Sequence, residues 1–156
     1  MRRALLTLFV CAAAVSTSAS EPAIKNSCDL LSKSEVEAVM GVPMRNPETQ
    51  IFGMCEYKSV GDHPYKAVHL SFERVESRQE WEKHERGIDP DVKAIVVPGI
   101  GDAALLWNRV LDARLSIIKG KTALNIMIDV GKMMPKTADT LPVALRLGQI
   151  AVPRVP

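Results

Sequence analysis

Leu115-Ser-Ile-Ile-Lys119-Gly-Lys-Thr122-Ala-Leu-Asn-Ile-Met-Ile128 is the stretch of sequence that decides the fold. Apolar residues alternate with other residues on both sides of Gly120-Lys121, as they do in β-strands with one buried face. Two connecting residues with glycine first predict a type II′ hairpin turn. If Lys119 pairs with Thr122, the apolar pairs all fall on one face, namely Ile117 with Leu124, Leu115 with Ile126 and Ala113 with Ile128. Residues 111–130 therefore predict a half-buried antiparallel hairpin.

Two helix-start motifs precede this hairpin. Residues 32–35 (Ser-Lys-Ser-Glu) and 77–80 (Ser-Arg-Gln-Glu) are capping boxes, in which serine and glutamate bond each other's backbone amides. Gly41 is expected to end the first helix and Gly87 the second. Two apolar side chains of the second helix are expected to face the core, Trp81 and Ile88.

A third helix is expected at residues 139–152, where Pro142 is tolerated because it falls in the first turn. Its expected packing stripe is Leu141, Ala144, Leu145, Gly148 and Ile150.

The other strand signals complete an α+β fold. Residues 52–59, 68–73 and 92–97 have alternating or β-branched composition, whereas periodicity leaves residues 103–107 open between a strand and a short helix. Residues 20–27 form a loose lead-in and residues 45–50 a polar loop. Residues 28–152 are therefore predicted to form a single domain, an antiparallel sheet of about five strands packed by three helices. The predicted order is helix, two strands, helix, three strands, helix.

A glycine-rich turn stands at residues 98–102, Pro-Gly-Ile-Gly-Asp. Gly99, Gly101 and Ala104 match the outline of a dinucleotide fingerprint, but that motif requires a long helix after the turn, and a hairpin follows here. We therefore interpret the turn as structural. Gly101 is expected to have positive φ or a close backbone neighbour, and Asp102 to accept backbone N–H bonds.

Residues 1–19 have the pattern of a secretory signal peptide. Arg2 and Arg3 give a positive start, residues 4–15 are apolar, and small residues lead to cleavage after Ala19. Lipid attachment at Cys11 is disfavoured because Val10, rather than a small residue, precedes it. The mature protein is expected in the periplasm or secreted, with no stable membrane insertion, because no later segment reaches the length of a membrane span.

Cleavage leaves a protein without net charge. The full sequence has 20 basic and 18 acidic residues, and the signal peptide contains two of the basic ones, Arg2 and Arg3. Aromatic residues are 4% of the sequence, and no basic cluster is interleaved with them. Nucleic acid is therefore not expected as a partner.

Cleavage also leaves two cysteines, Cys28 and Cys55. An oxidising compartment favours a disulfide between them, which is worth roughly 3–4 kcal/mol from chain entropy. A redox or metal site is disfavoured, because neither cysteine lies in a C-x-x-C motif or has a histidine at ligand spacing.

No catalytic set is recognisable in the sequence, so neither an enzyme nor a bound cofactor is expected. His63, His69 and His84 fall in a turn, on a strand and on a helix. His69 and Glu56 can meet across two strands on the outer face, which an exposed cross-strand pair explains as well as a catalytic one.

Three methionines, Met127, Met133 and Met134, are compatible with a soft copper site. Methionines beside an amphipathic sheet more commonly fill gaps in a core.

Several motifs recur in an order that resembles a known group of proteins. They are Cys28-x-Leu-Leu-Ser-x-x-Glu-Val36, Gly41, Cys55-x-Tyr57, Val97-Pro-Gly-Ile-Gly-Asp-Ala103, Lys119-Gly120 and a final helix. The pattern resembles bacterial exported proteins and lipoproteins that carry a domain of unknown function, and it covers nearly all of residues 27–150. The resemblance implies an exported α+β domain with a helix-strand-strand-helix start and a strand meander, and it carries over no catalytic residues. This chain departs from the lipid-anchored members because it lacks a usable lipidation motif.

The sequence therefore predicts an exported, non-enzymatic binding or accessory module of the cell envelope, with an envelope protein or a small ligand as its partner. Two alternatives remain. One is a hydrolase-type enzyme whose site combines the turn at residues 99–102 with outer-face polar residues. The other is a weak periplasmic copper binder.

Export is testable by mass. Protein recovered from the envelope fraction should lack residues 1–19 and begin at Ser20, because signal peptidase cuts after a small residue. Intact-mass spectrometry measures this directly. Full-length chain in the cytoplasm would contradict the assignment.

Overall fold

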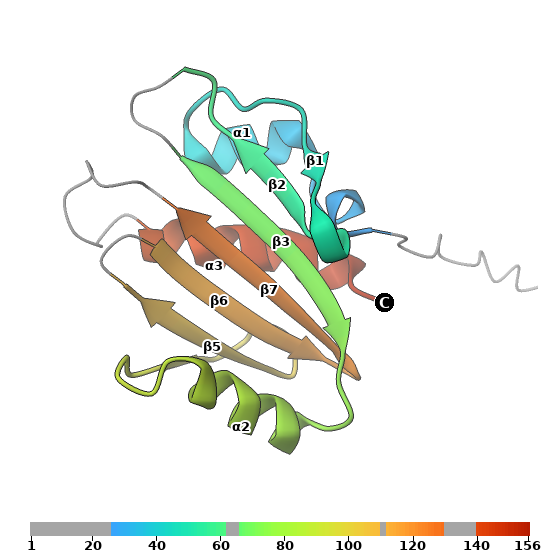
Figure 1. Cartoon of the computed structure of the whole chain (residues 1–156), viewed down its shortest axis with the longest axis vertical. Helices are drawn as coiled ribbons and strands as arrows, with labels where there is room; N and C mark the ends of the chain where they lie inside the picture. Colours follow the sequence, from blue (N-terminus) through green and yellow to red (C-terminus); the bar gives the residue numbers. More distant parts are fainter. Residues whose placement is uncertain (1–25, 62–65, 110–111, 130–139) are drawn as a thin grey trace, which may run out of the picture.

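Seven antiparallel strands form one sheet in the order β1-β2-β3-β7-β6-β5-β4 (Figure 1). The structure, a computed structural model, describes residues 26–61, 66–109, 112–129 and 140–156, and the strand count refers to these residues. The strands are β1 (Glu48–Thr49), β2 (Cys55–Lys58), β3 (Ala67–Arg74), β4 (Ile95–Val97), β5 (Ala103–Asn108), β6 (Asp112–Lys119) and β7 (Thr122–Asp129).

The expected register of the central hairpin is confirmed. Lys119 of β6 pairs with Thr122 of β7, and the inward pairs are Ile117 with Leu124, Leu115 with Ile126 and Ala113 with Ile128. Gly120 has φ +60°. Among the described residues other than glycine, only Phe52 has positive φ, so the φ of Lys121 is negative. Positive φ at the first turn residue alone is the pattern of a type II′ turn.

Three α-helices accompany the sheet: α1 (Lys33–Met40), α2 (Arg78–Ile88) and α3 (Thr140–Ala151). Ser32 and Glu35 form the complete expected capping box of α1, and Gly41 ends that helix with φ 69°. At α2 the Ser77 side chain accepts a bond from the Glu80 amide, but the return bond of the expected capping box, from the Ser77 amide to the Glu80 side chain, is not formed. Three short 3-10 helices complete the part of the chain that the structure describes: η1 (Ser27–Asp29), η2 (Ile51–Gly53) and η3 (Val152–Arg154).

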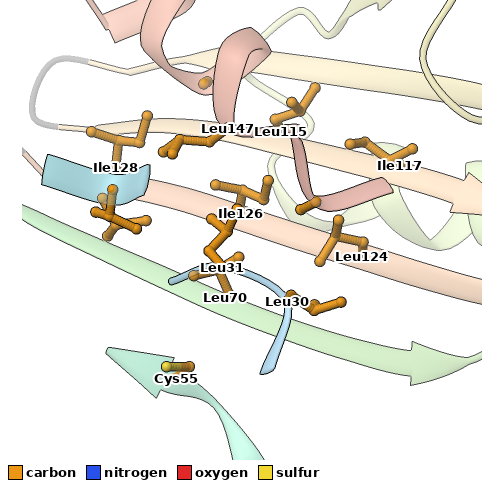
Figure 2. Packing of buried hydrophobic residues seen from close by; sticks show 14 of the residues in the cluster. Leu30, Leu31, Cys55, Leu70, Leu115, Ile117, Leu124, Ile126, Ile128 and Leu147 are labelled. Atoms are coloured by element: carbon orange, nitrogen blue, oxygen red, sulfur yellow. The ribbon is translucent and has the colours of Figure 1, made fainter. Parts of the chain in front are cut away.

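The helices cover the two faces of the sheet unequally. In Figure 1, α1 and α3 lie behind the sheet, and α2 runs along its lower border below β5. Behind the sheet is the inner face, where α3 packs on β6 and β7, η1 lies against β1, β2 and β3, and α1 packs on α3. Side chains from all three of these helical segments join one core. Figure 2 shows this core, in which Leu70, Leu115, Ile126 and Leu147 meet.

A second, smaller core lies on the outer face beneath α2. It consists of Trp81, Leu105, Trp107, Ile118 and Ala123. Residues of β5 and β6 near α2 are therefore buried on both faces, which differs from the half-buried sheet that alternation predicts. The outer sides of β2, β3 and β7 have no helix over them in Figure 1.

The α+β class and the three helices agree with expectation, but the strand count is seven rather than about five. Strand β5 was ambiguous because burial on both faces removes alternation from its sequence. Strand β1 falls within the expected polar loop. Both of its residues are exposed, so the sequence contains no hydrophobic pattern that predicts this strand. The strand is defined by its pairing with β2.

Element boundaries differ in three further places. Helix α2 continues through Gly87, which was expected to end it, and ends at Ile88 with Asp89 as its C-cap. Residues 51–53 form η2 instead of the beginning of a strand, and β4 begins at Ile95 rather than at residue 92. In α3 the buried residues include Leu147 and Ala151, which the expected stripe omits, whereas Leu141, Leu145 and Ile150 are partly buried. The lead-in ends by Asn26, whose side chain caps η1.

Two helical glycines should respond oppositely to substitution by alanine. A Cβ at Gly148 of α3 would lie 2.7 Å from Leu115 Cδ2 and 3.0 Å from Ile117 Cδ1, whereas a Cβ at Gly87 of α2 meets nothing within 4 Å. Gly87→Ala should stabilise the protein by about 0.5–1 kcal/mol through helix propensity. Gly148→Ala should destabilise it by about 1–2 kcal/mol through overpacking.

Urea unfolding of the disulfide-intact protein measures both changes. Stabilisation by Gly148→Ala of the same size as that by Gly87→Ala would show that α3 does not pack on β6 this closely.

Candidate functional site

The two cysteines form the expected disulfide. Cys28 and Cys55 are joined with an S–S distance of 2.03 Å and a Cα–Cα distance of 4.9 Å. The bond ties β2 to η1, which precedes α1. Beside it the Tyr57 hydroxyl donates to the Leu31 carbonyl, and burial, with the nearby charges of Glu35 and Asp29, raises the pKa of Tyr57 to about 12. These contacts hold η1 and the start of α1 against the sheet.

The turn at residues 99–102 packs against the end of the central hairpin. Gly99 and Gly101 have φ values of 78° and 61°. A Cβ at Gly101 would lie 2.6 Å from the Ile118 carbonyl oxygen. The Asp102 amide donates to that same oxygen at 2.8 Å, and Asp102 Oδ2 accepts from the Gly120 amide at 2.6 Å. Asp102 thus bonds the amide of the β6–β7 turn, eighteen residues away, instead of a local amide.

Asp102 does not meet the polar residues of the outer face. Asp102 accepts a bond from the Gly120 amide, and Arg114 lies six residues before Gly120 on β6. His69 of β3 is level with Arg114, with Met127 of β7 between them. Six residues of strand span roughly 20 Å. Asp102 therefore lies far from the row that contains Arg114 and His69.

A row of outward-facing residues, three of them polar, does cross the outer face. Strand pairing aligns Glu56, His69, Met127, Arg114 and Trp107, one from each of β2, β3, β7, β6 and β5. Helix α2 covers one end of this row. Between α2 and β2 lies a hollow of about 330 Å³, which we call the outer hollow. It is lined by Met54, His69, Ser71, Ile88, Arg109, Arg114, Asn125 and Met127.

Arg114 is held in the outer hollow by an acid and an aromatic ring. Its Nη2 donates to Glu85 Oε1 at 3.1 Å and lies 2.9 Å from Oε2. Glu85 is 0% exposed and Arg114 is 16% exposed. The guanidinium carbon lies 5.6 Å from the centre of the Trp107 ring. A buried carboxylate and an aromatic ring therefore fix the guanidinium in one orientation.

Glu85 explains how α2 is positioned. It follows Trp81 by four residues and precedes Ile88 by three, so the three side chains share one face of the helix. Trp81 Nε1 donates to Ser116 Oγ at 3.0 Å, beside the bond from Arg114 to Glu85. Burial raises the pKa of Glu85, and the Arg114 charge opposes that rise. Ile88 on the same face is 43% exposed, so the expectation that it joins the core is wrong, because the outer hollow lies beneath it.

The second arginine of the outer hollow is also held by acids. Arg109 Nε lies 3.2 Å from Asp89 Oδ2 and 3.6 Å from Asp112 Oδ1. Burial raises the pKa of Asp112, and the charge of Arg109 opposes that rise.

His69 and Glu56 are cross-strand partners, as the sequence indicated. Their Nδ1 and Oε1 atoms lie 3.8 Å apart, and their side chains are 14% and 11% exposed. Glu56 Oε2 also accepts from Gln50 Nε2 at 2.8 Å and lies 2.8 Å from Lys58 Nζ. Because His69 Nδ1 is buried, Nε2 is the ring nitrogen left for a ligand.

The remaining candidates are dispersed. His84 lines two shallow hollows on the far flank of α2, where Glu80 is a neighbour. His63, Met133 and Met134 lie outside the described residues, whereas Met127 lines the outer hollow. Over the described ranges, no three His, Cys, Asp or Glu residues are grouped to hold a metal ion.

Sequence reasoning did not single out Arg114, Asn125 or Glu85. The sequence nevertheless contains features that could have pointed to these three residues. Glu85 is a carboxylate on the apolar face of α2 between Trp81 and Ile88, and the hairpin register places Arg114 and Asn125 on the outward side. A charged residue on a helix face that packs on a sheet requires a partner there.

The chain matches no protein-family model, no curated protein and no solved structure.

The bond between Asp102 and the hairpin turn can be tested by two substitutions. Asp102→Asn keeps an oxygen acceptor for the Gly120 amide and should change stability by less than about 0.5 kcal/mol, whereas Asp102→Ala removes the acceptor and should cost about 1 kcal/mol. Thermal unfolding of both variants measures the difference. Equal stability of the two would mean that this bond does not hold the turn.

Proposed function

We propose that this protein is an exported, non-catalytic binding module of the cell envelope, and that the outer hollow is its ligand site. One observation carries the proposal. Arg114 is fixed by buried Glu85 through Nη2, and within the described chain no acceptor bonds its Nε or Nη1. A charged group that is held rigidly and left with open donors at a hollow is suited to recognising a ligand.

Export is supported from two directions. Residues 1–19 have the pattern of a signal peptide, and the Cys28–Cys55 disulfide is of the kind that persists in oxidising compartments. None of the described helices combines the length and apolar character that a membrane span requires. Resemblance of the motifs to bacterial exported proteins is consistent with the same location.

Binding is favoured over catalysis by the arrangement of the polar groups. Ser71 and His69 both line the outer hollow, but no hydrogen bond connects them within the described residues. A hydroxyl nucleophile requires a base within hydrogen-bond reach. Glu56 accepts a hydrogen bond from Gln50 and forms ion pairs with Lys58 and His69. Such a set of contacts is typical of a structural cluster.

Copper binding is a second candidate, because Met54, Met127 and His69 line the same hollow and all three are ligands that Cu(I) accepts. The two arginines of the outer hollow oppose a cation there, so an organic ligand is favoured.

Obstruction of the outer hollow tests the proposed function. Ser71→Leu adds bulk in the outer hollow without charge, whereas Ser34→Leu makes the same change at an exposed position of α1 on the other side of the sheet. Both mature variants and the wild type are incubated with the small-molecule fraction of envelope extract, and native mass spectrometry records any bound adduct.

We expect an adduct on the wild type and on Ser34→Leu, and at least a tenfold loss on Ser71→Leu. An adduct that persists on Ser71→Leu, or no adduct on any form, would contradict the proposed site.

A further inference from the structure

We infer that the ligand of the outer hollow is a small organic carboxylate with a short apolar group. The inference deepens the proposed function and rests on it. The juxtaposition that carries it is a set of hydrogen-bond donors with three apolar side chains among and beside them, with every nearby carboxylate placed outside the lining.

The donors of the outer hollow come from three strands. Arg114 presents Nε and Nη1, since its Nη2 is used by Glu85 and Asn125. Asn125 Oδ1 accepts from Arg114 at 3.1 Å. The amide nitrogen of Asn125 is therefore the end that remains for a ligand, as a donor. Ser71 adds a hydroxyl from β3.

The acids that compensate the arginines do not line the outer hollow. Glu85 is 0% exposed beneath α2, and it contacts Arg114 from behind. Asp89 and Asp112 contact Arg109 through Nε, which leaves the two terminal nitrogens of that guanidinium for other acceptors. Glu56 stands beside His69 but is also outside the lining. An anion in the outer hollow thus meets donors first, and the acids orient those donors.

The planar fork of arginine matches a carboxylate. Two parallel N–H groups bond its two oxygens, which gives both affinity and orientation. The two terminal nitrogens of Arg109 form such a pair. Arg114 adds single N–H donors, because both parallel pairs of a guanidinium include Nη2, which Glu85 and Asn125 occupy. Fixed geometry favours the single bonds from Arg114, because its guanidinium loses little freedom on binding when Glu85 and Trp107 already hold it.

The apolar walls require more of the ligand than a carboxylate. Met54, Ile88 and Met127 come from the entrance to β2, the end of α2 and the middle of β7. Methionine side chains adapt to varied shapes. A volume of about 330 Å³ is at the lower end of the range for ligand pockets, so a short chain of carbons fits better than a large ring system.

Three probes separate these requirements. Hexanoate has both features, hexanamide replaces the carboxylate by a neutral amide, and acetate lacks the carbon chain. Trp81 and Trp107 are the two tryptophans of the sequence, and Trp107 stacks on Arg114, so intrinsic fluorescence of the mature protein reports binding. Hexanoate should bind at least tenfold more tightly than either of the other probes.

Two isosteric substitutions provide the variant and its control. Asn125→Asp keeps the oxygen that accepts from Arg114 and replaces the donor amide by a second carboxylate oxygen. Asn26→Asp makes the same change at the cap of η1, where an oxygen already accepts the Cys28 amide. Hexanoate affinity should fall at least tenfold in the first and remain unchanged in the second. If Asn125→Asp does not fold, Ser71→Asp places a carboxylate in the same hollow and should have the same effect.

The outcomes distinguish the inference from the proposed function. Equal binding of hexanoate and hexanamide, or of hexanoate by Asn125→Asp and wild type, would overturn the carboxylate assignment. An envelope adduct that Ser71→Leu abolishes would still support the outer hollow as a binding site. No hexanoate binding to the wild type would overturn this inference, and absence of any envelope adduct would overturn the proposed function as well.

Discussion

The register of β6 against β7 is the constraint on which the rest of the structure depends. Side chains of a strand alternate between faces, so a shift of one residue would exchange the two faces of the hairpin. In the observed register Leu115 and Ile126 face the inner core, whereas Arg114 and Asn125 face outward. A slipped register would bury Arg114 among leucines without an acid to pair with. The core and the outer hollow therefore require the same pairing.

Helix α2 covers one end of the outer face and so borders the outer hollow. Trp81 anchors it in the smaller core, and Glu85 brings a carboxylate to Arg114 at a position without solvent. Buried ion pairs contribute little net stability, because desolvation of two charges offsets their attraction. Orientation of the guanidinium is the more direct consequence of the pair. Because α2 extends no farther over the sheet, β3 and β7 keep their outer side chains available.

Much of the fold could be predicted from the sequence, because local chemistry agrees with tertiary structure there. Gly120 between two alternating runs specified the hairpin and its register, and Ser32 with Glu35 specified the start of α1. The missed strands lack such agreement. Strand β1 is held by its neighbour rather than by its own pattern, and β5 is buried on both faces. The candidate site was not predicted because Glu85 and Arg114 are 29 residues apart and meet only when α2 docks.

The most direct test of this account is where a carboxylate binds. In the mature protein with isotope-labelled side chains, NMR resolves the Nε–H of Arg114 and the amide group of Asn125 separately from groups elsewhere. Titration with hexanoate should shift these two signals together and saturably, while the Gly120 amide, which Asp102 bonds at the other end of the hairpin, stays unchanged. Shifts centred on Gly120 and Asp102, with Arg114 and Asn125 unmoved, would contradict the assignment of the outer hollow as the ligand site.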